Sequence, residues 1–93
     1  MEIELEWDSA KSLSCYRERG FDFLYAAGVF LDPERVDAVD DRYDYGEERR
    51  IVYGKIDGRL YVVVYTLRGT GHRIISARRA NRRDERRVTR AER

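Results

Sequence analysis

Residues 49–67 read RRIVYGKIDGRLYVVVYTL, and this stretch decides the fold. Two runs rich in β-branched and aromatic residues flank the dipeptide Asp57-Gly58. An Asp-Gly pair between two such runs favours the two-residue type I′ turn, because both residues tolerate the positive φ angles that this turn needs. We therefore predict a β-hairpin, with strands at 49–56 and 59–67.

A third strand follows at residues 72–78, after the glycine-containing turn Arg68-Gly69-Thr70-Gly71. Pairing outward from the two turns places Ile51 opposite Val64 and Leu67 opposite His72. Because side chains alternate along a strand, this register assigns every residue of the three-stranded meander to one of two faces.

We expect one face to be mainly aliphatic and to form the core under two helices. It holds Ile51, Tyr53, Leu60, Val62, Val64, Ile75 and Ala77, with Arg49, Thr66 and Arg73 at one end. The other face is mixed, aromatic and basic. It holds Arg50, Val52, Gly54, Tyr61, Val63, Tyr65, Ile74, Ser76 and Arg78.

The N-terminal part predicts one strand and two helices. Ile3, Leu5 and Trp7 alternate with glutamates, which indicates a half-buried strand. One helix starts after Asp8 or Ser9 and ends at Gly20; the second starts after Asp22 and ends before Pro33. Their predicted buried stripes are Ala10, Leu13 and Tyr16 or Arg17 in the first, and Phe23, Ala26, Ala27 and Phe30 in the second.

Two weaker elements complete the prediction. Residues 36–40 are a candidate edge strand, whose acidic side chains discourage edge-to-edge aggregation. Asn81 is a suitable N-cap with Asp84 at the third helical position, so a last helix is expected at about 82–89. This helix has one large apolar residue, Val88, and would fray by itself. Nothing in the pattern divides the chain, and we expect one domain over 1–93.

Charge is distributed unevenly along the 93 residues, although the net charge is only +1. From Arg68 onward there are ten arginines, no lysines and three carboxylates, a net +7 that leaves −6 for the preceding part. Such asymmetry indicates a basic surface for nucleic acid, and arginine forks suit phosphate groups. The alternative is a solvated helix that is rich in arginine.

Residue types restrict the possible chemistry. The chain has one cysteine, Cys15, and one histidine, so an intrachain disulfide and the usual zinc sites are excluded. We expect Cys15 to be a small buried residue in a cytoplasmic protein. The acidic N-terminus is unlike a signal peptide, and no apolar run could span a bilayer. We expect no cofactor and no metal.

RNA cleavage without a metal fits this composition, because RNA carries its own nucleophile, the 2′-hydroxyl. Arginines can position the phosphate and stabilise its charge, but their high pKa makes them poor proton carriers. The candidates for proton transfer are Glu47, Glu48, His72, Tyr61 and Tyr65. His72 could equally be a surface histidine. Tyr61 and Tyr65 could stack on bases or be ordinary strand tyrosines under a helix.

Several short motifs in order give the chain a family resemblance. They are Trp7-Asp8-Ser9-Ala10-Lys11, Gly20-Phe21-Asp22-Phe23, Val29-Phe30, Asp32-Pro33, Gly46-Glu47-Glu48-Arg49, Gly54, Val62-Val63-Val64-Tyr65-Thr66, Arg68-Gly69 and Arg73-Ile74-Ile75-Ser76-Ala77-Arg78-Arg79-Ala80. With these motifs the chain resembles the BrnT family of type II toxin–antitoxin toxins. One departure is Arg19, where that family usually has histidine before the glycine.

The resemblance implies an α+β, RelE-like fold: two N-terminal helices packed on one face of a small, mostly antiparallel sheet, with a short C-terminal helix. It implies an endoribonuclease that arrests translation. It also implies a cognate antitoxin, a small DNA-binding protein of BrnA type, through which the complex would contact operator DNA and repress its operon. No membrane partner is implied.

The resemblance also implies the site residues. The catalytic set is Glu48, Arg49, Arg68, Arg73 and Arg78. Charge stabilisation falls to Arg78 and Arg68, and proton transfer to Glu48. Independently of the resemblance, the tyrosines of the mixed face and the C-terminal arginines are expected to bind RNA: Tyr61, Tyr65, Arg79, Arg82 and Arg83. Arg82 and Arg83 could instead contact an antitoxin. The alternatives are a non-catalytic relative that acts as co-repressor with the antitoxin, and a general nucleic-acid-binding module.

Overall fold

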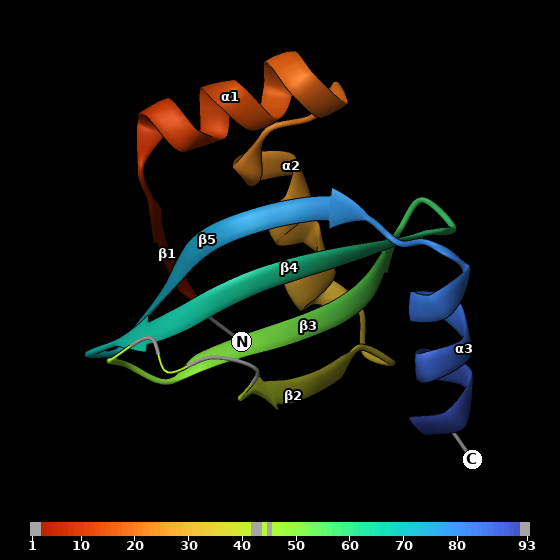
Figure 1. Cartoon of the computed structure of the whole chain (residues 1–93). Coiled ribbons are helices and arrows are strands. Elements are labelled where there is room, and N and C mark those ends of the chain that lie inside the picture. The colour runs from red at the N-terminus through yellow and green to blue at the C-terminus, as the bar shows by residue number, and fades with distance from the viewer. Residues whose placement is uncertain (1–2, 42–43, 45, 92–93) are drawn as a thin grey trace.

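The computed structural model of the chain describes residues 3–41, 44 and 46–91. Within these ranges the chain forms a five-stranded sheet, three α-helices and one 3₁₀ helix (Figure 1). The elements are β1 (Glu4–Trp7), α1 (Ser9–Arg19), α2 (Phe23–Ala26), the 3₁₀ helix η1 (Ala27–Leu31), β2 (Val36–Asp40), β3 (Arg49–Ile56), β4 (Arg59–Arg68), β5 (Gly71–Arg79) and α3 (Arg82–Ala91). The α+β class is confirmed.

The hairpin of β3 and β4 forms as its sequence predicts. Asp57 and Gly58 have φ angles of 52° and 78°, both in the left-handed region that a type I′ turn needs. Ile51 pairs with Val64, and across the second turn Leu67 pairs with His72. The two turns therefore set the register of the central three strands.

The sheet is mixed, and the expectation of a mostly antiparallel sheet is corrected at one edge. The strand order is β1-β5-β4-β3-β2, and β1 runs parallel to β5, with Trp7 beside Ile74. Strand β2 forms the opposite edge, as predicted, antiparallel to β3. No local turn joins β1 to β5, since the helices and strands β2, β3 and β4 lie between them in the chain, so their relative direction depends on packing between distant segments.

Helix α1 has the predicted ends but a different buried face. The Asp8 side chain accepts hydrogen bonds from the first-turn amides, and Gly20 ends the helix with a φ angle of 84°. The buried residues are Ser12 and Cys15, whereas Leu13 is half exposed. Polar contacts explain the difference: the Ser12 hydroxyl accepts a hydrogen bond from a backbone amide of α2 at 3.0 Å.

The second helical segment is less regular than predicted. Asp22 caps it, but after one turn the α-helix becomes the 3₁₀ helix η1, which ends before Pro33. The predicted stripe of Phe23, Ala26, Ala27 and Phe30 is buried. Helix α1 lies alongside β5, whereas η1 packs on β3 and β4, so the expected simple pair of helices on one face is found only in part (Figure 1).

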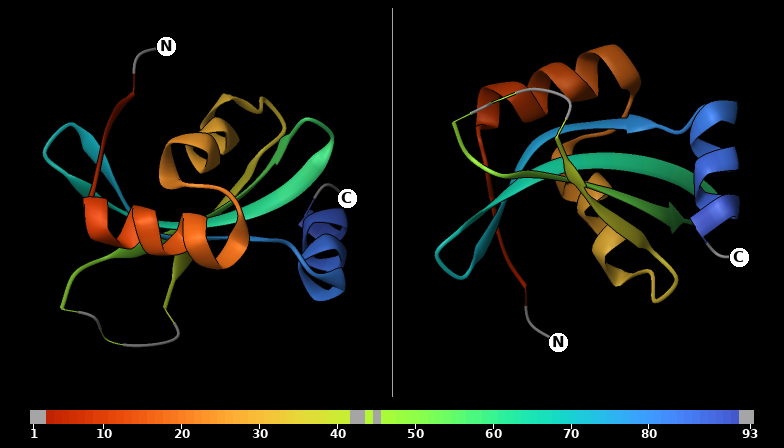
Figure 2. Two further views of the ribbon diagram at one scale, coloured as in Figure 1. Left: turned by 90° about the horizontal axis from the view of Figure 1, so that it is seen from above. Right: turned by 60° about the horizontal axis from the view of Figure 1, so that its bottom comes forward.

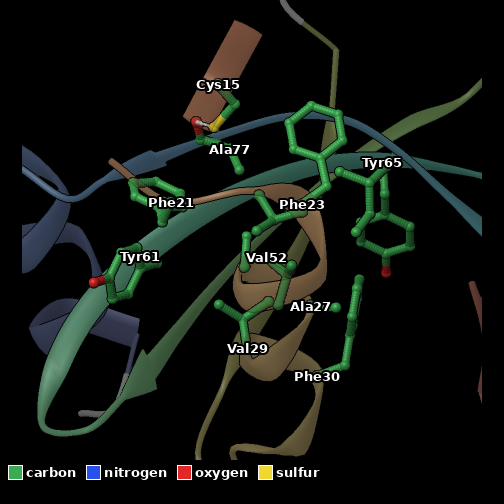
Figure 3. Close-up of a cluster of buried hydrophobic side chains, with 13 residues drawn as sticks. Cys15, Phe21, Phe23, Ala27, Val29, Phe30, Val52, Tyr61, Tyr65 and Ala77 are labelled. Carbon is green, nitrogen blue, oxygen red and sulfur yellow. Dashed lines mark hydrogen bonds between the residues drawn. The ribbon is translucent and has the colours of Figure 1, made fainter. Parts of the chain in front are cut away.

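The predicted core face was the wrong one. Residues from α1, α2 and η1 pack on the face of Val52, Val63 and Ile74, which the sequence analysis described as mixed (Figure 3). Tyr61 and Tyr65 belong to this core, with their rings edge-on to aromatic residues of the helical layer at 5.1 Å. The large apolar rings bury well despite their hydroxyl groups, and this outweighs the aliphatic character of the other face.

A β-bulge in β5 also changes the face of the residues that follow it. Tyr65 still pairs with Ile74, but Val64 then pairs with Ser76, so β5 holds one additional residue. As a result Ala77 points into the helix-side core instead of away from it. Arg78 pairs with Val62 on the opposite face, rather than with Tyr61 as the uninterrupted register predicted.

Helix α3 packs on this opposite face, at the end of the sheet near the β3–β4 hairpin tip (Figure 2). Val88 contacts the cluster of Ile51, Tyr53 and Val62. The Asn81 side chain accepts the amide hydrogen of Asp84, whose carboxylate accepts that of Asn81, as the predicted cap requires. Among the helices in the described ranges, none has the length and apolar character needed to cross a bilayer.

We predict that Gly54→Ala destabilises the protein by about 1–3 kcal/mol, because the core has no room for a methyl group there. An added Cβ would lie 2.8 Å from the Val29 carbonyl oxygen, so the backbone of η1 would have to move. Gly28→Ala is the matched control, since the atoms nearest to its Cβ would be those of the Ile56 side chain, at 3.3 Å, and not backbone atoms. Urea unfolding of both variants is the measurement, and equal losses would contradict the packing argument.

Candidate functional site

Five polar residues form one row across the whole sheet. The strand pairings place Glu6 beside Arg73 and Arg73 beside Thr66. They continue with Thr66 beside Arg49 and Arg49 beside Asp40. Directly paired residues of neighbouring strands project to the same side, so all five side chains lie on the face opposite α1 and α2. We call this set the arginine row.

The row holds its two guanidinium groups between carboxylates. Arg73 Nη1 lies 3.6 Å from Glu6 Oε1 at one edge of the sheet, and the nearly buried Asp40 is the strand partner of Arg49 at the other. Thr66 lies between the two arginines with 2 % of its surface exposed. Its hydroxyl donates a 2.7 Å hydrogen bond to a backbone carbonyl just before β3, which fixes the start of that strand.

A third cation and a further carboxylate lie beside the row. Arg68 follows Thr66 by two positions on β4 and therefore belongs to the same face. Its Nη2 atom lies 3.8 Å from Oε2 of Glu47, and both side chains are accessible to solvent. Three arginines of the predicted catalytic set, at 49, 68 and 73, are thus brought together, with Glu47 beside them.

Glu48 takes part in a different network, on the side of the sheet that faces the helices. Its Oε1 atom lies 3.4 Å from Arg50 Nη1. The same guanidinium donates through Nε to Asp37 at 3.1 Å. The carboxylate predicted for proton transfer is therefore paired with Arg50 of this network.

Tyr65 is chemically unsuited to act as a base. Its hydroxyl donates a hydrogen bond to Asp37. Burial, together with this carboxylate, raises the pKa of Tyr65 to about 12, so the phenol keeps its proton at neutral pH. His72 stacks on the Tyr65 ring with centroids 5.2 Å apart and meets Phe30 at 5.4 Å. His72 is thus a packing residue of the helix-side face, away from the row.

The two tyrosines predicted to stack on bases are buried in the protein core. Tyr61 is 4 % exposed and Tyr65 is 2 % exposed. Their rings contact Phe21, Tyr25 and Phe30 of the helical layer. The alternative interpretation, ordinary strand tyrosines under a helix, is the one that the structure supports, because a buried ring has no face free for a base.

Arg78 lies apart from the row and is engaged by α3. Its Nη1 and Nη2 atoms donate to the two carboxylate oxygens of Asp84, at 2.6 and 3.2 Å. Its strand partner Val62 is four residues from Thr66 on β4, which is about 13 Å at the usual rise of a strand. The uninterrupted register placed Arg78 on the mixed face with Tyr61 and Tyr65; the bulge in β5 moves it to the face of Val62, at the end of the sheet far from Thr66.

The remaining predicted RNA-binding arginines are exposed but dispersed. Arg79 lies on the helix-side face, with its guanidinium carbon 5.9 Å from the centre of the Phe21 ring. Arg82 and Arg83 lie in the first turn of α3. Among the residues that the structure describes, no three side chains of His, Cys, Asp or Glu are placed to share a metal ion.

Sequence reasoning found the central members of the site and missed those at its borders. It placed Arg49, Thr66 and Arg73 at one end of one face, which the strand pairings confirm. It did not include Glu6 or Asp40. Both belong to edge strands that no local turn joins to the meander, so the register calculated from the two turns did not extend to them.

Comparison with known proteins adds one finding. The sequence model of a family described as “Ribonuclease toxin, BrnT, of type II toxin-antitoxin system” matches residues 7–84. The match includes every member of the arginine row except Glu6, and it ends at Asp84, in the first turn of α3. No curated protein matches the chain.

We predict that the contact between Arg78 and Asp84 gives a pH-dependent stabilisation. The hydrogen bonds from Arg78, followed by that from the Asn81 amide, lower the pKa of Asp84. A carboxyl group whose pKa is lower in the folded than in the unfolded protein stabilises the fold at pH values above its unfolded pKa, about 3.9. This stabilisation is lost as the pH falls through the pKa of the folded state. Asp84→Asn should therefore lower the free energy of unfolding by about 1–2 kcal/mol at pH 7. Solvent screening at the partly exposed Arg78 keeps this loss below that of a fully buried charged pair.

Urea unfolding of Asp84→Asn at pH 7 and at pH 3 tests this. Glu85→Gln is the control, because the neighbouring Glu85 is exposed and should show little change at either pH. A loss in Asp84→Asn that is as large at pH 3 as at pH 7 would show that the charge of Asp84 is not responsible.

Proposed function

Because the chain belongs to the BrnT family of ribonuclease toxins of type II toxin–antitoxin systems, we propose that it cleaves RNA internally without a metal ion and so inhibits translation and growth. The observation that carries this proposal is the arginine row, with Arg68 beside it. Three guanidinium groups on one face of a rigid sheet can contact the non-bridging oxygens of a single phosphate and its neighbours.

The proposed reaction uses the nucleophile that RNA supplies. The 2′-oxygen attacks the adjacent phosphorus and the bond from phosphorus to the 5′-oxygen breaks, which leaves a 2′,3′-cyclic phosphate and a 5′-hydroxyl. Arg49 and Arg73 hold the phosphate and stabilise the charge that develops on its oxygens. Thr66 lies between them on the middle strand, and its hydrogen bond to the chain before β3 keeps their spacing constant.

We assign acceptance of the 2′-hydroxyl proton to Glu47 and not to Glu48. The Glu47 carboxylate lies 3.8 Å from Arg68, on the same face as the row, whereas Glu48 pairs with Arg50 of the helix-side network. The leaving 5′-oxygen takes its proton from water. Arg78 is assigned to the attachment of α3, because Asp84 binds both of its terminal nitrogens.

The family description also implies a cognate antitoxin as partner. We propose that this antitoxin is a small DNA-binding protein of BrnA type, that it neutralises the toxin by covering the arginine row, and that operator DNA is contacted only through it. An acidic segment of the antitoxin would complement the three exposed or half-buried guanidinium groups. Such a system would act in the cytoplasm, where both its RNA target and its operator are found.

We predict that Arg73→Ala slows RNA cleavage by about 10²–10³-fold, the usual effect of removing one preorganised donor to a developing oxyanion. Arg73→Lys should recover part of the rate, because it restores the charge but not the planar fork. The assay follows end-labelled RNA in a buffer with EDTA, with growth after induced expression as a second readout.

Arg17→Ala is the matched control, since Arg17 lies exposed on α1, on the other side of the molecule. It should cleave RNA at the rate of the unaltered protein. Full activity in Arg73→Ala, or activity that disappears with EDTA, would reject the proposed mechanism.

Substitution of each of the two neighbouring glutamates shows which one accepts the proton. Glu47→Gln should lower the cleavage rate by about 10²–10⁴-fold, the usual contribution of a general base, whereas Glu48→Gln should change it little. Each variant is isosteric and on the surface, so both should fold. The measurement is single-turnover cleavage between pH 5 and pH 8, and a larger loss in Glu48→Gln would assign the base to the helix-side network.

A further inference from the structure

Helix α3 carries a set of arginines that the proposed reaction does not use. Arg83, Arg86, Arg87 and Arg90 surround one shallow hollow on its surface. Their spacing of three and four residues places them on one side of the helix, and all four are exposed. We call this set the α3 arginine surface.

Carboxylates do not neutralise this surface within the part of the chain that the structure describes. None of the four guanidinium groups there lies within ion-pair distance of an Asp or Glu, and the contact of Arg87 is with the Tyr53 hydroxyl, at 3.3 Å. Asp84 is buried against Arg78. Glu85 lines the hollow at the β3–β4 hairpin tip and also a hollow with Arg82, Arg86 and Arg90, but it forms no ion pair with the described arginines.

The arrangement works against the stability of an isolated helix. Like charges three and four residues apart repel each other along a helix surface, and here they recur over its full length. The cap formed by Asn81 and Asp84, the Arg78 contact and the burial of Val88 keep the helix formed nevertheless. The α3 arginine surface is thus held in place before any partner binds.

The α3 arginine surface lies mostly outside the residues that match the family, but on the same side of the sheet as the arginine row. The match ends at Asp84, so Arg86, Arg87 and Arg90 lie beyond the part that the family describes. Arg87 contacts Tyr53, whose side chain projects from the same face of the sheet as the arginine row. Helix α3 packs beside the strand pair Val62 and Arg78. Along β4, Val62 lies four residues, or about 13 Å, from Thr66, which is a span of a few nucleotides.

We propose that the α3 arginine surface binds the phosphodiester backbone of the RNA substrate, outside the phosphate that reacts. The proposal rests on the ribonuclease function proposed above and extends it from a reacting centre to a longer binding site. Arginine forks fit phosphate oxygens in pairs, and a surface with four arginines and no lysine has the donors for adjacent phosphates. The surface extends the face on which the proposed reaction holds the RNA, so we assign it to RNA; an acidic polypeptide such as the antitoxin is the alternative that the test below separates.

Binding to an RNA that cannot be cleaved tests the proposal without requiring catalysis. The probe is a fluorescent single-stranded 2′-O-methyl RNA of about 20 nucleotides, followed by anisotropy over a range of salt concentrations. Arg86→Gln/Arg90→Gln should weaken binding about 10- to 25-fold at about 0.1 M salt and reduce the slope of log K against log salt by about 1.4, as expected for two lost phosphate contacts. Arg86→Lys/Arg90→Lys should retain most of that slope.

The matched control is Arg17→Gln/Arg19→Gln, which makes the same change in net charge on α1. It should weaken binding less than about threefold. Circular dichroism of each variant verifies that α3 is still formed, and glutamine at exposed helical positions should preserve it.

Three results would overturn the inference. Equal affinity and salt slope in the α3 variant and the unaltered protein would reject it and leave the ribonuclease proposal standing, since that depends on Arg73. Unaltered RNA binding with lost binding of a poly-glutamate peptide would assign the surface to an acidic polypeptide. No binding of RNA by the unaltered protein would reject both proposals.

Discussion

The pairing of β4 with both of its neighbours is the constraint on which the rest of the structure depends. Side chains alternate along β4, so Tyr65 points toward the helices while Thr66 points to the opposite face. On one side the Tyr65 ring packs against Phe30 and His72, which also contact each other. On the other side Thr66 lies between Arg49 and Arg73. A slip of one residue would bury the arginines and expose the aromatic core.

The division between the faces explains how so small a chain can present so many charges. The helix-side face uses large rings, which bury much apolar area for each residue, and η1 approaches β3 closely because Gly54 has no side chain. The opposite face then needs only a small apolar cluster under α3. The rest of that face can hold cations, each restrained by a neighbouring carboxylate or a strand partner, at modest cost in stability.

Helix α3 joins the face of the sheet that holds the arginine row to the proposed binding surface. Its attachment combines the burial of Val88 with polar contacts: Arg78 binds Asp84, and Asp84 in turn caps the helix. The same aspartate therefore fixes where the helix begins and how it lies on the sheet. Through this contact Arg78, which the register separates from the arginine row, contributes to the placement of the arginines on α3.

The sequence by itself determined the local elements and the grouping of the central arginines. The Asp57-Gly58 turn, the helix caps and the shared face of Arg49, Thr66 and Arg73 follow from short-range rules, because a turn sets register and register sets the face. Motifs along the chain also indicated its family. Only the tertiary structure decided which face the helices cover, the bulge in β5 and the parallel pairing of β1. These depend on packing between segments far apart in the chain, where ring burial and helix placement outweigh local pattern.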